Sequence, residues 1–131
     1  MKKKILILMG GISGERNISI MTGKACYKAL KKKGYFVRTL DPKINFIDQL
    51  RKEKPHIVFN ALHGRYGEDG FIQSILELEK IKYTHSGVLA SSIAINKVVS
   101  KKIFIKNKIA TPNYLVYELN SNKNLLTELK K

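Results

Sequence analysis

Two glycine-rich stretches carry the residue types that could do chemistry. Residues 10–16 read GGISGER and residues 61–70 read ALHGRYGEDG. They contain Ser13, Glu15 and His63, whose hydroxyl, carboxylate and imidazole can hydrogen-bond to a small charged ligand. Segments so rich in glycine and charge do not pack a core. Each is therefore either a solvated turn or a place where the chain meets a ligand.

The first stretch favours a cationic ligand group over a phosphate. A glycine-rich loop that leads into a helix could hold an anion on its amides, but this one fits neither GxxxxGK[ST] nor GxGxxG. Glu15 lies near the expected start of the helix, where the helix dipole keeps a carboxylate ionised, and an ionised carboxylate suits an ammonium group. The alternative, that Glu15 merely caps its own helix, stays open at this point.

The second stretch places His63 at the end of an apolar run, where its ring can point into a cleft. The alternative is a half-buried histidine satisfied by backbone groups, which is the commoner fate of a lone histidine. Glu68 and Asp69 precede an expected helix, and we expect them to cap it and to brace the loop. His56 and His85 have no neighbours at metal-ligand spacing, so we assign them no chemistry.

The elements that must position these residues alternate between strand and helix. Apolar runs and helical spacing predict strand 4–10, helix 15–33, strand 35–40, helix 46–54, strand 56–62, helix 71–80, a brief strand at 82–87, helical structure from 88 to 108 broken near Asn96, an extended segment at 111–119, and a helix from Ser121. Ser13 and Asn45 are the expected caps of the first two helices. The first helix shows apolar residues at helical spacing, and Cys26 within it is expected in the core.

This alternation predicts an α/β fold, an open parallel sheet with helices on both faces. Ligands of such sheets bind beyond the carboxyl ends of the strands. Both glycine-rich stretches follow strand ends, so we expect Ser13, Glu15, His63 and Arg65 to meet at one edge. That convergence is the argument from the residues for a binding site.

Composition excludes several classes of protein. The net charge of +15 invites a nucleic-acid interpretation, but only four of the 25 basic residues are arginines, the lysines are spread along the chain, and no nucleic-acid-binding motif is present. No apolar run approaches the ~20 residues that span a bilayer. The single cysteine excludes an internal disulfide and suggests a reduced cytoplasm. We therefore expect no nucleic acid or membrane partner and a cytoplasmic location.

Three motifs resemble the N-terminal domain of the D-alanine–D-alanine ligases, which belong to the ATP-grasp enzymes. They are GGISGERNISIMTG, ALHGRYGEDGFIQ and YTHSGVLASSIAINKVVSK, in family order and with family-like spacing. The resemblance runs from about Lys4 to Pro112. It implies a Rossmann-like N-terminal substrate-binding domain at residues 1–112 and the start of a truncated central domain at residues 113–131. The family makes D-alanyl-D-alanine for peptidoglycan through an acyl phosphate, using ATP and Mg²⁺.

The resemblance also implies roles for single residues. Glu15 is similar to the glutamate that binds the ammonium group of the first D-alanine, and His63 to the histidine near the carboxyl end of that substrate. Ser13 and Ile18 would line the pocket of the glutamate. Lys97 resembles the lysine that contacts the phosphates of ATP, while the ligands of the magnesium ion are expected in the missing C-terminal part. A homodimer is also implied.

Two residues depart from the family pattern. Gly14 stands where alanine is usual, and Tyr66 stands where a small residue such as glycine is common. The sequence does not choose between D-alanine, D-lactate and D-serine as the second substrate. The alternatives from other classes are a standalone α/β small-ligand-binding module, which includes a truncated relic, and a basic nucleic-acid binder.

Overall fold

The computed structural model of the chain describes residues 3–117. The chain divides into two compact units, Met1–Ile95 and Asn96–Lys131. The first unit holds the sheet and both glycine-rich stretches, and the described part of the second, up to residue 117, holds one helix and the segment after it. Each unit is described by itself. The predicted boundary between residues 112 and 113 stays a prediction.

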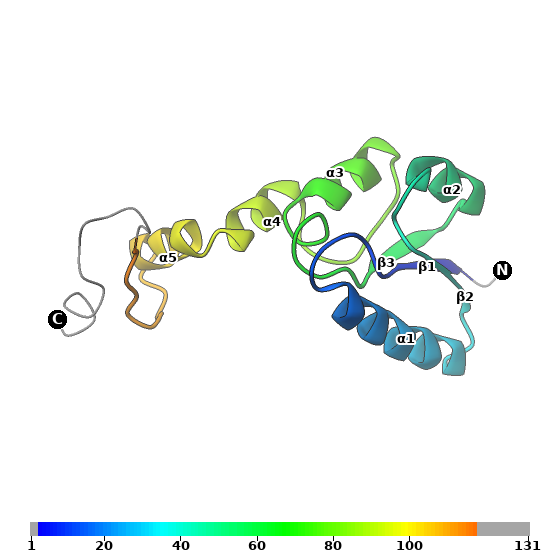
Figure 1. The fold of residues 1–131 in the computed structure, drawn as a ribbon, viewed down its shortest axis with the longest axis horizontal. Coiled ribbons are helices and arrows are strands. Elements are labelled where there is room, and N and C mark those ends of the chain that lie inside the picture. The colour runs from blue at the N-terminus through cyan, green and yellow to red at the C-terminus, as the bar shows by residue number, and fades with distance from the viewer. Residues whose placement is uncertain (1–2, 118–131) are drawn as a thin grey trace. The chain divides into compact units, whose positions relative to one another are not determined.

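The sheet of the first unit has three parallel strands in the order β2-β1-β3 (Figure 1). β1 (Lys4–Leu8) is central, β2 is Phe36–Leu40 and β3 is Ile57–Asn60. In register, Leu8 lies beside Leu40 on one side and beside Asn60 on the other. The central strand is an almost unbroken apolar run because helices cover it on both sides. The three predicted strands are confirmed, with shorter bounds.

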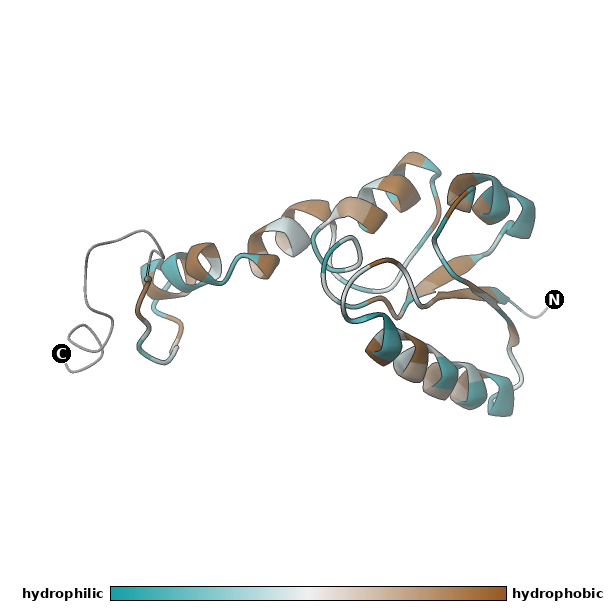
Figure 2. Ribbon diagram, in the orientation of Figure 1, coloured by the Kyte–Doolittle hydropathy of each residue, from teal (hydrophilic) through white to brown (hydrophobic). Residues whose placement is uncertain are grey.

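One face of the sheet is covered by α2 (Phe46–Glu53) and α3 (Phe71–Leu78). The buried residues of this face form one apolar cluster: Leu6, Leu8, Leu40, Phe46, Leu50, Val58, Leu62, Ile72 and Leu76. In Figure 2 the inner strands are largely brown, whereas the outer side of α2 is teal. Asn45 is the N-cap residue of α2, as expected, although its side chain makes no capping hydrogen bond.

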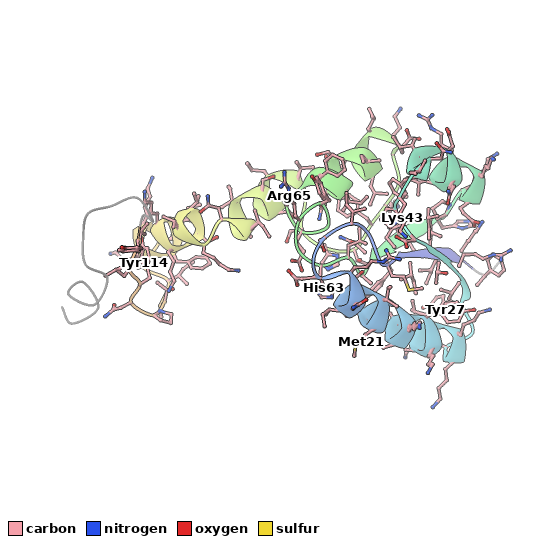
Figure 3. All side chains as sticks on the ribbon, in the orientation of Figure 1. Met21, Tyr27, Lys43, His63, Arg65 and Tyr114 are labelled. Atoms are coloured by element: carbon pink, nitrogen blue, oxygen red, sulfur yellow. The ribbon has the colours of Figure 1, made fainter. Side chains whose placement is uncertain are left out.

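The opposite face of the sheet is covered by α1 (Arg16–Lys32). Cys26 is half-buried and packs with Tyr27 and Leu30 against a second buried cluster of Ile7, Val37 and Ala61. Helices therefore lie on both faces, which confirms the predicted fold class. The apolar residues whose spacing indicated this helix do not mark its buried face: Ile18 and Met21 are 51% and 66% exposed, and Ala25 and Ala29 are also exposed. Figure 3 shows Met21 on the side away from the sheet.

Beyond α3, the chain adds a single parallel bridge between Val58 and Tyr83, at the predicted brief strand. Helices α4 (Val88–Ile95) and α5 (Lys97–Lys106) follow, and the predicted break at Asn96 is confirmed. Asn96 caps α5, because its side-chain oxygen accepts the amide of Val99. Residues 109–117 form neither helix nor strand, and the helix predicted from Ser121 lies outside the described residues. Among residues 3–117, no helix has the length and apolar character to cross a membrane.

The contact between α1 and the sheet depends on Gly23, which is buried. A Cβ at this position would lie 2.5 Å from the Cβ of Met9. We expect Gly23→Ala to lower the free energy of unfolding by about 1–2 kcal/mol, because the forced separation outweighs the better helix propensity of alanine. Urea unfolding measures the effect. Gly14→Ala is the control, since a Cβ there meets nothing within 4 Å; equal midpoints for the two variants would contradict the prediction.

Candidate functional site

The carboxyl ends of the three strands bring three loops to one edge of the sheet. Residues 9–15 follow β1, residues 41–45 follow β2 and residues 61–70 follow β3. This arrangement follows directly from three parallel strands, whose carboxyl ends all point to the same side. Both glycine-rich stretches therefore lie at the edge where the sequence predicts a site.

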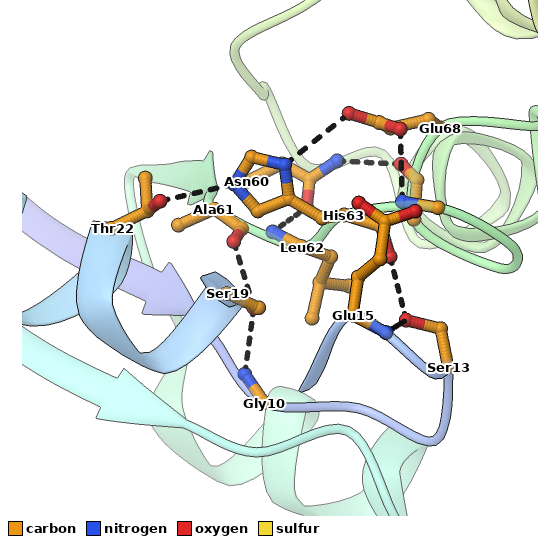
Figure 4. Close-up of polar contacts among 12 residues, drawn as sticks. Gly10, Ser13, Glu15, Ser19, Thr22, Asn60, Ala61, Leu62, His63 and Glu68 are labelled. Carbon is orange, nitrogen blue, oxygen red and sulfur yellow. Dashed lines mark hydrogen bonds and ion pairs between the residues drawn. The ribbon is translucent and has the colours of Figure 1, made fainter. Parts of the chain in front are cut away.

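Ser13, Glu15 and His63 are brought together at this edge (Figure 4). The Ser13 hydroxyl donates to the main-chain oxygen of His63 at 2.8 Å and accepts the amide of Glu15 at 3.2 Å. The Glu15 carboxylate lies beside Gly64: a Cβ on that glycine would be 2.7 Å from Glu15 Oε1. Gly64 also has φ of +68°. Any other residue there would have a strained backbone and a side chain that clashes with Glu15. The two motifs thus form one structure.

Glu15 occupies the N-cap position of α1 but makes no capping hydrogen bond with its side chain. The prediction that Ser13 caps this helix is wrong, because Ser13 lies two residues earlier and satisfies the amide of Glu15 instead. The alternative in which the Glu15 carboxylate serves its own helix is also not what the structure has. Within residues 3–117, that carboxylate accepts no hydrogen bond. Its oxygens can therefore accept hydrogen bonds from the N–H groups of a ligand such as an ammonium group.

His63 is held by two side chains rather than by backbone groups. Its Nε2 lies 3.0 Å from the hydroxyl of Thr22 on α1, and its Nδ1 lies 3.6 Å from Glu68 Oε1. The second oxygen of Glu68 accepts the amide of Gly64 at 2.8 Å. The expected role of Glu68 in bracing its loop is confirmed. Both ring nitrogens of His63 therefore face a polar side chain, Nε2 that of Thr22 and Nδ1 that of Glu68.

The amides of the first loop are already used within the protein. Gly10 N–H donates to the hydroxyl of Ser19 at 2.8 Å, and that hydroxyl donates to the main-chain oxygen of Ala61. Gly11 N–H donates to Asp41 Oδ1 at 2.8 Å. Because these two amides have acidic or hydroxyl acceptors, the start of the loop is not a free anion cradle. The preference for a cationic ligand group at Glu15 is thereby strengthened.

Asp41, the first residue after β2, forms a two-pronged ion pair with Arg16. Arg16 Nη1 and Nη2 lie 3.1 and 2.6 Å from the two carboxylate oxygens. Partial burial acts to raise the pKa of the Asp41 carboxyl, but the hydrogen bonds from Arg16 and from the Gly11 amide outweigh it and hold the pKa below its usual value. The same hydrogen bond raises the pKa of Arg16. Both groups are therefore charged at neutral pH.

The second loop is braced from inside by Asn60, which is buried at the end of β3. Its amide nitrogen donates to the oxygen of Gly67 at 2.8 Å, and its amide oxygen accepts Leu62 N–H at 3.1 Å. Asp69 accepts the amides of Tyr66 and Phe71 at 2.9 and 3.1 Å. The expected bracing role of Asp69 is confirmed. Asp69 also accepts the amide of Phe71, the first residue of α3, although the N-cap position of this helix is Gly70.

Tyr66, the departure from the family pattern, has a left-handed backbone with φ of +67°. That conformation explains why a small residue such as glycine suits the position. The tyrosine ring packs edge-on against Phe71, with centroids 5.3 Å apart, and the guanidinium of Arg65 lies 5.0 Å from its centroid. These contacts partly offset the backbone strain. Arg65 thus lies at the predicted edge, stacked on its neighbour.

A cavity of about 790 Å³ opens beside this site, between the three loops and the helices α2 and α3. Ser13, His63 and Arg65 line it, together with mostly apolar residues. Among the residues that the structure describes, Glu15 and Ile18 are not part of its lining. Ile18 lies one helical turn after Glu15 on α1 and is half exposed.

Lys97, the remaining predicted site residue, belongs to the second compact unit. It is exposed and is the first residue of α5, directly after the capping residue Asn96. An ammonium group beside the positive end of a helix has the charge that phosphate oxygens require. In the part of the chain from 3 to 117, no group of three or more His, Cys, Asp or Glu residues could hold a metal ion.

Sequence reasoning missed four residues that build this edge: Ser19, Thr22, Asp41 and Asn60. Ser19 and Thr22 lie inside a helix, where no spacing rule separates a bridging hydroxyl from an ordinary one. The place of Asp41 at this edge could have been predicted, because it follows a strand of the same sheet as the two glycine-rich stretches, but its ion pair with Arg16 could not. Asn60 is the last residue of its strand, where a buried amide has to brace the loop that follows.

Comparison with known proteins gives a consistent result. A family model described as D-ala D-ala ligase N-terminus matches residues 37–86. The chain is 56% identical to a D-alanine–D-alanine ligase of Pelagibacter ubique and 49% identical to one of Carboxydothermus hydrogenoformans, over 100% and 92% of its length. These matches cover 43% and 39% of the two relatives, so the chain spans less than half of their length.

Solved structures agree with these relatives. The chain is similar to the D-alanine–D-alanine ligase of Bacillus anthracis complexed with ATP, with a TM-score of 0.77 and 34% identity. The match covers 97% of this chain and 44% of that protein. The folded part described above therefore corresponds to a portion of a longer enzyme.

Proposed function

The chain belongs to the D-alanine–D-alanine ligase family, and on that premise we propose that it is the N-terminal, substrate-binding part of a ligase that joins two D-alanines for peptidoglycan synthesis. The observation that carries the proposal is the juxtaposition of Glu15 and His63 through Ser13 and Gly64. The Glu15 carboxylate lies beside Gly64, the residue that follows His63, and an anionic carboxylate near an imidazole suits a zwitterionic amino acid.

In this proposal, Glu15 binds the ammonium group of the first D-alanine. A charge-assisted hydrogen bond from an ammonium group to a carboxylate is roughly twice as strong as a neutral one. Since this carboxylate has no internal hydrogen bond in the described part of the chain, it can accept the hydrogen bond of the ammonium group without losing another partner. The hydroxyl of Ser13 ties the loop that carries Glu15 to the main chain of His63. Ile18, which is exposed one turn further along α1, supplies an apolar surface beside the substrate.

His63 contacts the carboxyl end of the same substrate. The ring is held between Glu68, 3.6 Å from Nδ1, and Thr22, 3.0 Å from Nε2. A neutral imidazole donates one hydrogen bond and accepts one, so a ring nitrogen that contacts the substrate exchanges its present partner for the ligand. The His63 side chain is partly exposed, which leaves room for that contact.

ATP serves as the second reactant, and Lys97 contacts its phosphates. The exposed ammonium group at the start of α5 fits this role, because a positive charge offsets the charge on the phosphoryl group being transferred. ATP transfers its γ-phosphoryl group to the carboxylate of one D-alanine, which gives an acyl phosphate and ADP. The amine of the second D-alanine then attacks the acyl carbon, and the C–O bond to phosphate breaks with release of phosphate and a proton. Mg²⁺ is part of this proposal through the resemblance alone, which implies metal ligands outside these residues.

The proposal is tested on the longer protein. The reading frame downstream of Lys131 is sequenced, and the protein it encodes is expressed with these 131 residues in place. We expect formation of D-alanyl-D-alanine that depends on both ATP and D-alanine, with release of phosphate. A stop codon at this point, or an encoded protein that forms no dipeptide, would favour the standalone binding module. The same assay with D-lactate or D-serine identifies the second substrate. The homodimer and the cytoplasmic location stay predictions.

A further inference from the structure

The ion pair between Asp41 and Arg16 encloses the start of the loop that carries Glu15. Asp41 Oδ1 accepts the amide of Gly11, while Arg16 Nη1 donates to the main-chain oxygen of the same residue at 2.8 Å. Both polar groups of Gly11 are thus bound to the two partners of one ion pair. A Cβ on Gly10 would lie 2.7 Å from each of Arg16 Nη1 and Asp41 Oδ1. The pair therefore packs directly on the main chain.

This clamp is connected to the proposed substrate site by only one peptide bond. Arg16 follows Glu15 in the chain and is the first residue of α1. On the other side of the loop, Ser13 fixes the main chain of His63. The segment from Gly10 to Arg16 contains three glycines, so its backbone would lose much conformational entropy each time a ligand ordered it. A clamp that orders it beforehand removes this cost from binding.

We propose that Asp41 is a positioning residue, which fixes residues 10–16 so that the carboxylate of Glu15 stays beside Gly64 and ready for substrate. Asp41 does not touch the substrate in this proposal; it acts through Gly11 and Arg16. The inference rests on the proposed function for its kinetic readout. The proposed site so far uses the loops after β1 and β3. Asp41 adds the loop after β2, so that all three strands of the sheet contribute to it.

The chain offers a matched control. Arg51 and Glu79 form a second two-pronged pair, with distances of 2.8 and 2.6 Å. This pair joins the last turn of α2 to the C-cap of α3 and contacts neither glycine-rich loop. Arg51 lowers the pKa of the Glu79 carboxyl through the same kind of hydrogen bond. Asp41→Asn and Glu79→Gln therefore remove one charge each from similar pairs at different places.

The experiment measures kinetics and amide hydrogen exchange of the longer protein. Asp41→Asn keeps the shape of the side chain but places an amide where Arg16 needs an acceptor. We expect it to raise the KM of the first D-alanine about tenfold while kcat changes by less than about twofold. The KM of ATP is expected to stay constant, and exchange in residues 10–16 to become faster. Glu79→Gln is expected to change none of these quantities.

Each outcome decides something. If the unsubstituted protein makes no dipeptide, the proposed function has failed, and the exchange data alone then test the clamp. If dipeptide forms but Asp41→Asn behaves as Glu79→Gln does in both readouts, the inference is overturned. Should Asp41→Asn not fold, Arg16→Lys replaces it, because lysine keeps the charge and loses the second prong. An unchanged KM and unchanged exchange in Arg16→Lys would equally overturn the inference.

Discussion

Replacing Glu15 by glutamine in the longer protein is expected to raise the KM of the first D-alanine by about 10- to 100-fold. A hydrogen bond between an ammonium group and a carboxylate contributes about 1.5–3 kcal/mol, and each 1.4 kcal/mol is about a factor of ten in affinity. Glutamine keeps the size and one acceptor but removes the charge. The measurement is initial velocity over a range of D-alanine concentrations, fitted for two binding steps.

Glu77→Gln is the control for this substitution. Glu77 lies on α3 and accepts the hydroxyl of Tyr83 at 2.6 Å, away from either glycine-rich loop, so its loss should leave both D-alanine steps unchanged. His63→Gln is a companion variant with a smaller expected rise, since glutamine can still reach Thr22. An affinity for the first D-alanine that stays the same in both Glu15→Gln and His63→Gln would show that these residues do not form the substrate site.

The sequence was sufficient to predict that Glu15 and His63 lie close together, because a single topological rule applies to both. Residues after parallel strands meet at one edge, and the two stretches were recognisable by their glycines. The same rule applies to Asp41, but the dipeptide Asp41–Pro42 also has the composition of an ordinary turn. An aspartate that initiates a turn and an aspartate that clamps a neighbouring loop look identical until the partner, Arg16, is known.

The face that α1 turns to the sheet was beyond prediction for a different reason. Apolar periodicity identifies a buried face when burial is driven by large side chains. Here the helix approaches the sheet closely through Ser19 and Gly23, both fully or nearly covered, and the larger Ile18 and Met21 remain exposed. Ser19 can be buried because its hydroxyl donates to Ala61 and accepts from Gly10. Small size and hydrogen bonding, neither visible in hydropathy, set the orientation.

The exposed apolar residues of α1 lie close to the proposed substrate site. Ile18 lies one turn after Glu15 on the exposed side of the helix, so a surface at this place is next to the proposed substrate. The chain covers only 43% of its Pelagibacter ubique relative. A substrate held by Glu15 alone would remain open to water on that side, and an acyl phosphate exposed to water is lost to hydrolysis.

A protein that consists of these 131 residues and no others is therefore expected to have no ligase activity. Its sheet has two buried clusters of its own, so we expect it to fold, but three requirements of the reaction are not met by the described residues. They supply one proposed phosphate contact, Lys97, no metal-ligating cluster and no assigned site for the second D-alanine. The loss of ligase activity should exceed the effect of any single substitution, because positioning of both reactants lowers the activation barrier of such reactions by about 7–11 kcal/mol. An assay for phosphate release and for dipeptide, run beside the longer protein, measures this, and product above a buffer blank from the 131-residue protein would contradict it.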